Sequence, residues 1–90
     1  MLNTLESLFK LARERKSKPV DGSYTNKLLS DKSLSKAKVL EEINELIEAV
    51  EKDTNKIHEA ADVMYHLIIY LEANGIKIEE IMGELSSRKK

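Results

Sequence analysis

A chain of 90 residues with 16 acidic and 15 basic side chains predicts one small domain with a formal charge of −1. This balance excludes a protein that binds nucleic acid or a membrane surface mainly through charge. The absence of cysteine excludes disulfides and thiolate metal sites, and no apolar stretch reaches the roughly 20 residues of a membrane-spanning helix. We therefore expect one cytoplasmic domain over residues 1–90, with neither nucleic acid nor membrane as a partner.

The first part of the chain predicts a helix, a loop and a short helical turn. Asn3 is expected to cap the first helix, with Glu6 three residues on as in a capping box. "KSKPVDGS" (16–23) contains the only proline and predicts the first loop. "YTNKLLS" (24–30) then predicts a short helical turn.

Two longer helices follow. The first is expected from about Leu34 to Glu51, and its apolar face comprises Val39, Leu40, Ile43, Leu46, Ile47 and Val50. The second contains "HEAADVMYHLIIYL" (58–71), which is apolar around nearly its whole circumference and is therefore expected to be buried on most sides. Gly75 is a natural residue to end it. A last helix is expected within 76–88.

No segment has the pattern of a β-strand long enough to form a sheet, so the expected fold is all-α. It is a small helical bundle in which the two longer helices run antiparallel through a short connection. The remaining helices of one chain are too short to cover the apolar helix 58–71 fully. We therefore expect a homodimer to complete the fold.

Carboxylates interrupt both longer helices at the same spacing. Glu59 and Asp62 lie within the apolar helix, where an unpaired charge would be prohibitively costly. Glu42 and Glu45 repeat the spacing on the other helix, and antiparallel packing can bring all four around one point. Cations must then neutralise them, and an all-oxygen ligand set favours Mg²⁺, with Mn²⁺ as a substitute.

Other interpretations of these residues remain open. The glutamates of the long helix, taken alone, are typical of a solvated face, and Asp62 and His66 can belong to a satisfied polar network. For His66 a hydrogen-bonded core histidine is the favoured interpretation. His58, Asp62 and His66 also share a stripe that would suit zinc, but zinc would leave the other three carboxylates unexplained.

Four segments carry a resemblance over essentially the whole chain: "SYTNKLL" (23–29), "KVLEEINE" (38–45), "HEAADVMYHLIIYL" (58–71) and "GIKIEEIMGELSSR" (75–88). They resemble the phosphoribosyl-ATP pyrophosphohydrolase family, the histidine-biosynthesis branch of the all-α MazG-like nucleotide pyrophosphohydrolases. The superfamily signature E-x-x-E…E-x-x-D falls on Glu42, Glu45, Glu59 and Asp62. The resemblance implies Mg²⁺-dependent hydrolysis of phosphoribosyl-ATP to phosphoribosyl-AMP and pyrophosphate by a homodimer. Leu40 and Ile43 stand where the family commonly has glycine and alanine.

Residues outside the signature are also candidates for roles in this reaction. Glu41 is the candidate to orient or deprotonate the attacking water, unless it is simply a surface glutamate. Lys27, Lys38 and Arg88 are the candidates for phosphate contacts, with solvated side chains as the alternative. Two other functions remain open: a MazG-type house-cleaning nucleoside triphosphate pyrophosphohydrolase, and a catalytically silent helical dimerisation module.

Overall fold

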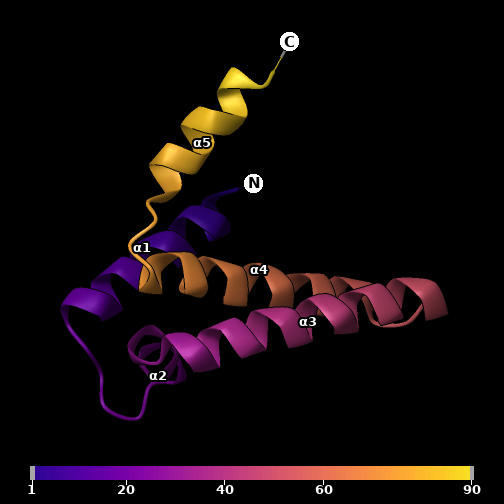
Figure 1. Cartoon of the computed structure of the whole chain (residues 1–90), viewed down its shortest axis with the longest axis horizontal. Helices are drawn as coiled ribbons and strands as arrows, with labels where there is room; N and C mark the ends of the chain where they lie inside the picture. Colours follow the sequence, from indigo (N-terminus) through magenta and orange to yellow (C-terminus); the bar gives the residue numbers. More distant parts are fainter. Residues whose placement is uncertain (1, 90) are drawn as a thin grey trace.

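The structure is a computed structural model that describes residues 2–89. In this range the chain forms five helices and no strand: α1 (Asn3–Ser17), α2 (Tyr24–Ser30), α3 (Lys32–Lys52), α4 (Lys56–Ala73) and α5 (Ile78–Ser87). The all-α prediction is confirmed. Figure 1 shows α3 and α4 as a long antiparallel pair, with α2 beside the N-terminal end of α3. Across residues 2–89, none of the helices combines the length and apolar character that crossing a membrane requires.

Short polar side chains begin two of the helices. Ser23 caps α2 and Asp31 caps α3, and each side chain accepts a hydrogen bond from the backbone N–H three residues on. The expected cap of α1 is wrong, because the cap residue is Leu2 and Asn3 already lies inside the helix. At the end of α4, Gly75 adopts a φ of +71°, as predicted for the residue that follows a helix.

The apolar core lies where α1, α2 and α4 meet. Ala12, Leu28 and Ile69 have no exposed surface and come from these three helices. Half-buried side chains of Leu29, Leu34 and Tyr65 pack around them. This core holds the N-terminal part of the chain against α4, whereas α3 contacts α4 along its length.

The apolar face predicted for α3 lies largely outside the contact between α3 and α4. The buried residues of α3 are Ser35, Val39, Glu42 and Ala49. Four residues of the predicted apolar face are instead exposed, by 37% to 57% of their surface: Leu40, Ile43, Ile47 and Val50. The sequence predicted which residues share this face but not what covers it, and in a single chain α4 covers only one edge of the apolar stripe.

A single chain does not cover α4 fully, as was expected from the shortness of the other helices. Ile57, Met64 and Leu67 are 88%, 49% and 40% exposed. The buried residues of α4, among them Ile68 and Ile69, lie on the side that meets the other helices. Both longer helices therefore leave large apolar side chains uncovered.

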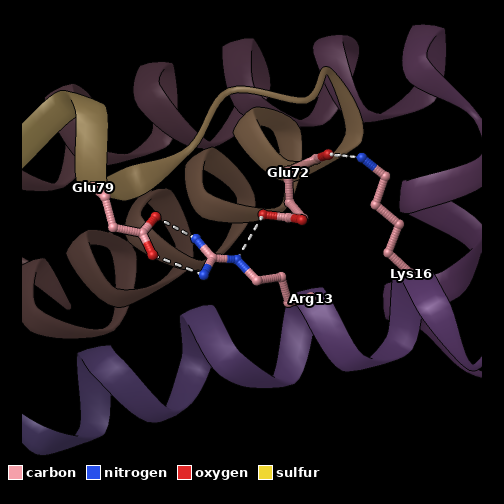
Figure 2. A network of polar contacts seen from close by, with 4 residues as sticks. All are labelled: Arg13, Lys16, Glu72 and Glu79. Atoms are coloured by element: carbon pink, nitrogen blue, oxygen red, sulfur yellow. Dashed lines mark hydrogen bonds and ion pairs between the residues drawn. The ribbon is translucent and has the colours of Figure 1, made fainter.

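Ion pairs at one junction tie α5 to the rest of the molecule. The Arg13 guanidinium of α1 donates two hydrogen bonds, of 2.8 and 2.5 Å, to the carboxylate of Glu79 at the start of α5. Figure 2 also shows the Lys16 ammonium donating to the Glu72 backbone oxygen at the end of α4, across 2.8 Å. The bonds from Arg13 hold α5 at its N-terminal end, whereas the bond from Lys16 joins α1 to α4. No residue of α5 is buried.

Candidate metal centre

The packing of α3 against α4 brings together the four carboxylates of the predicted signature. One oxygen each of Glu42, Glu45 and Glu59 lie within 4.8 Å of one another. Glu59 and Asp62 form a second group with His58 within the same limit. The two groups share Glu59, so the side chains gather around one place between the two helices.

Two oxygens of this cluster are buried without a partner. Glu42 is only 9% exposed, and in residues 2–89 its Oε2 and the Oε2 of Glu59 accept no hydrogen bond. Burial raises the pKa of Glu42, and the neighbouring carboxylates of Glu45 and Asp62 raise it further. The pKa of Glu59 is raised by burial and by Glu45 in the same way. Such oxygens need a positively charged partner, and an all-carboxylate set of this kind fits a hard divalent cation.

His66 does not take part in a zinc site with His58 and Asp62. Its Nδ1 lies 2.9 Å from the Asp62 backbone oxygen, which can only accept, so Nδ1 carries the proton and donates. Nε2 is then the acceptor for the Tyr24 hydroxyl at 3.0 Å. Both ring nitrogens are occupied, and His66 is buried. The interpretation of His66 as a hydrogen-bonded core histidine is confirmed.

His58 joins the carboxylates, although the sequence analysis considered it only as a possible zinc ligand. Its Nε2 lies 3.3 Å from Oδ2 of Asp62. The spacing of four residues on one helix puts the two side chains on the same face. That spacing was the signal available in the sequence.

The remaining predicted site residues lie at different places. Lys38 and Glu41 form an ion pair of 3.1 Å on α3, close in sequence to Glu42. Lys27 lies on α2, outside the carboxylate groups. Arg88 pairs with Glu84 of its own helix at 3.1 Å, and Figure 1 shows the C-terminal end of α5 projecting away from α3 and α4. Within one chain, therefore, Arg88 is not brought to the carboxylates.

Two segments that carry the family resemblance touch each other beside this centre. The Tyr24 ring stacks on Tyr65 with 6.4 Å between ring centroids, and the Thr25 hydroxyl is hydrogen-bonded to the Tyr65 hydroxyl at 2.5 Å. Together with the bond from Tyr24 to His66, these contacts join α2 to α4. Sequence reasoning did not single out Tyr24, and its only signal was its place in the quoted segment "SYTNKLL".

A family model described as phosphoribosyl-ATP pyrophosphohydrolase matches residues 2–89. The chain belongs to this family. The resemblance drawn from the four segments is therefore confirmed. The residues of the E-x-x-E…E-x-x-D motif quoted for the resemblance are the carboxylates that α3 and α4 bring together.

Curated relatives of the chain are similar over most of its length. The phosphoribosyl-ATP pyrophosphatase of Clostridium acetobutylicum is 43% identical over 89 residues, which cover 93% of this chain and 79% of that protein. The phosphoribosyl-ATP pyrophosphatase of Methanobrevibacter smithii is 35% identical, over 94% of this chain and 93% of that protein. The histidine biosynthesis bifunctional protein HisIE of Pyrococcus furiosus is 40% identical over 99% of this chain, which spans only 43% of that protein. No solved structure matches.

Proposed function

We propose that this chain is a single all-α domain that hydrolyses phosphoribosyl-ATP to phosphoribosyl-AMP and pyrophosphate, the second step of histidine biosynthesis. The support is the family to which residues 2–89 belong, together with relatives named phosphoribosyl-ATP pyrophosphatase. The structural observation that carries the proposal is the carboxylate cluster with its two unpartnered buried oxygens. Because the substrate is a nucleotide made inside the cell, we propose that the enzyme acts in the cytoplasm.

We assign the four carboxylates to Mg²⁺, with Mn²⁺ as a substitute, because both ions take oxygen ligands. Glu42 and Glu45 approach from α3, whereas Glu59 and Asp62 approach from α4. When bound, Mg²⁺ supplies positive charge to phosphate oxygens and lowers the pKa of water beside it. In this proposal the antiparallel helices hold the carboxylates near one another before substrate binds.

Glu41 and Lys38 are the proposed chemical groups next to the cluster. The Glu41 carboxylate is exposed and so can accept a hydrogen bond from an attacking water and then its proton. Lys38, 3.1 Å from Glu41, holds that carboxylate in place and presents a cation to a phosphate oxygen. The water attacks a phosphoryl group in line with the departing pyrophosphate.

We further propose that two chains form a homodimer. The support is the uncovered apolar surface on both longer helices, which includes Leu40 and Ile47 of α3 and Ile57 and Met64 of α4. An apolar groove among α1, α4 and α5 adds further exposed apolar side chains, such as Met82. An exposed apolar groove of this kind is typical of an interface.

Substrate comparison tests the proposed activity. Purified protein with Mg²⁺ is incubated separately with phosphoribosyl-ATP, dUTP and dCTP, and pyrophosphate release is measured. Preferred turnover of phosphoribosyl-ATP is expected. Preferred turnover of dUTP or dCTP would indicate a house-cleaning enzyme instead, and no turnover of any of the three would indicate a silent dimerisation module.

A further inference from the structure

An open cavity lies beside α2, between this helix and the loop of residues 19–23. Its volume is about 680 Å³, within the range of about 300–1,000 Å³ that is usual for small-molecule sites. Lys16, Tyr24 and Lys27 line it, together with that loop. None of the four signature carboxylates belongs to its lining. The cavity is therefore distinct from the metal centre.

Side-chain hydrogen bonds hold the walls of the cavity in place. Asn26 accepts a hydrogen bond of 2.9 Å from the Val20 backbone and donates one of 2.7 Å to the Arg15 carbonyl. The Arg15 guanidinium donates to the Ser23 hydroxyl across 2.8 Å. These bonds tie the loop to both α1 and α2, so the cavity is formed without a ligand.

The charged groups around the cavity favour an anion. Lys16, Lys27 and Asp21 are its charged lining residues, which leaves one net positive charge. The Lys16 ammonium already donates to the Glu72 carbonyl. In residues 2–89 the Lys27 ammonium makes neither an ion pair nor a hydrogen bond. Lys27 is thus the cation that is available to a bound anion.

Tyr24 connects the cavity with the metal centre. Tyr24 is one of the residues that line the cavity, and it is 44% exposed. Its hydroxyl donates to His66, which in turn donates to the Asp62 carbonyl. Burial raises the pKa of Tyr24. The charge of Lys38 lowers this pKa, and the charge of Glu42 raises it. Tyr24 therefore lies between the cavity and α4, the helix that carries Glu59 and Asp62.

Phosphoribosyl-ATP has two anionic ends: the triphosphate and the phosphate of its second ribose. An enzyme can distinguish it from ATP by recognising the second end at a place apart from the metal. We propose that the cavity binds this phosphoribosyl phosphate, with Lys27 as its cation and the Tyr24 ring as the wall along which the base lies. This inference rests on the proposed function. In it, Lys27 binds the phosphoribosyl phosphate, whereas Lys38 and the ion held by the carboxylates bind the triphosphate.

The first test uses ribose 5-phosphate as the probe and needs no catalysis. Metal-free protein is titrated and the backbone amide shifts of Gly22 and Lys27 are followed by NMR. Saturable shifts are expected in the wild type, and Lys27→Gln is expected to weaken binding about tenfold, the usual effect of losing one hydrogen bond to a charged group. Lys27→Arg should retain binding, and the control Lys36→Gln, on exposed α3 surface, should not change it. Absence of shifts around the loop, or equal binding by Lys27→Gln, would overturn the proposal.

The second test measures discrimination between substrates. The ratio of kcat/KM for phosphoribosyl-ATP to that for ATP is determined for the wild type, Lys27→Gln and Lys36→Gln. Lys27→Gln is expected to lower this ratio about tenfold, and Lys36→Gln to preserve it. An unchanged ratio in Lys27→Gln would overturn the proposed cavity role while leaving the proposed activity intact. A wild type that does not hydrolyse phosphoribosyl-ATP would instead refute the proposed activity, and the ribose 5-phosphate titration would still decide whether the cavity binds this group.

Discussion

The Tyr24 hydroxyl of α2 donates a hydrogen bond of 3.0 Å to Nε2 of His66 on α4. The opposite ring nitrogen of His66 donates to the backbone carbonyl of Asp62, across 2.9 Å. A short helix from the first third of the chain is thereby anchored one turn from Asp62, a carboxylate of the proposed metal centre. The bond from Tyr24 to His66 therefore holds α2 against α4, the helix that carries Asp62.

Tyr24→Phe keeps the ring but leaves the buried Nε2 of His66 without a donor. The free energy of unfolding should fall by about 1–3 kcal/mol, the usual cost of an unsatisfied buried acceptor. Urea denaturation followed by circular dichroism measures this change. Tyr70→Phe is the matched control, because the structure gives the Tyr70 hydroxyl no hydrogen bond within residues 2–89. Equal losses in the two variants would show that the bond to His66 contributes nothing specific.

Glu45→Gln and Asp62→Asn should each abolish turnover of phosphoribosyl-ATP. Each removes a negative charge from the proposed metal ligands, so metal binding weakens, while repulsion among the carboxylates of the metal-free protein is relieved. Thermal unfolding without metal should therefore show a fold as stable as the wild type or slightly more stable. Glu48→Gln, which alters an exposed carboxylate paired with Lys52, should retain activity. Wild-type activity of Glu45→Gln or Asp62→Asn at limiting Mg²⁺ would contradict the four-carboxylate site.

The raised pKa values of Glu42 and Glu59 predict how the stability of the metal-free protein depends on pH. Both groups bind protons more tightly in the folded chain than at their ordinary value of 4.5. The stability that these two groups contribute is therefore fully present below pH 4.5. It is lost as the pH rises through their raised pKa values in the folded chain. The free energy of unfolding is measured in EDTA across this range, for the wild type and for the double variant Glu42→Gln and Glu59→Gln. The wild type should lose stability relative to the double variant as the pH rises, and a constant difference would contradict the assigned shifts.

Ile47→Glu places a charge on the exposed apolar face of α3, where half of the Ile47 surface is uncovered in one chain. It should convert a dimer into a monomer, because burying an unpaired carboxylate in an interface is costly. Sedimentation at micromolar concentration measures the mass, and circular dichroism checks helicity. Lys52→Glu, at an exposed position of the same helix, is the control and should remain dimeric. A wild type that sediments as a folded monomer would refute the dimer.

The helices and the carboxylate cluster were accessible to sequence reasoning because both depend on local spacing. Apolar residues at helical intervals predicted α3 and α4, and the paired spacing of Glu42 with Glu45 and of Glu59 with Asp62 predicted which side chains meet. The sequence did not show which helix or second chain packs against each apolar face. Periodicity groups Leu40 with its neighbours on one stripe but does not say whether α4 or a second chain covers them.

Long-range contacts were also beyond the sequence pattern. The bond from Tyr24 to His66 joins residues 42 positions apart, and nothing in the local pattern of either helix specifies the other. The position of α5 depends on Arg13 and Glu79, which lie 66 positions apart. The Arg13 guanidinium lowers the pKa of Glu79 to about 2. The sequence around either residue gave no sign that the two form a pair.

The most direct test of the account is pyrophosphate release from phosphoribosyl-ATP by the purified wild-type protein, measured with Mg²⁺, with Mn²⁺ and with EDTA. The four carboxylates and their two unpartnered oxygens predict that pyrophosphate and phosphoribosyl-AMP form in equal amounts with either ion. EDTA should stop the reaction, and excess Mg²⁺ should restore it. Undiminished turnover in EDTA, or no turnover of phosphoribosyl-ATP with either ion, would contradict the proposed metal-dependent hydrolysis.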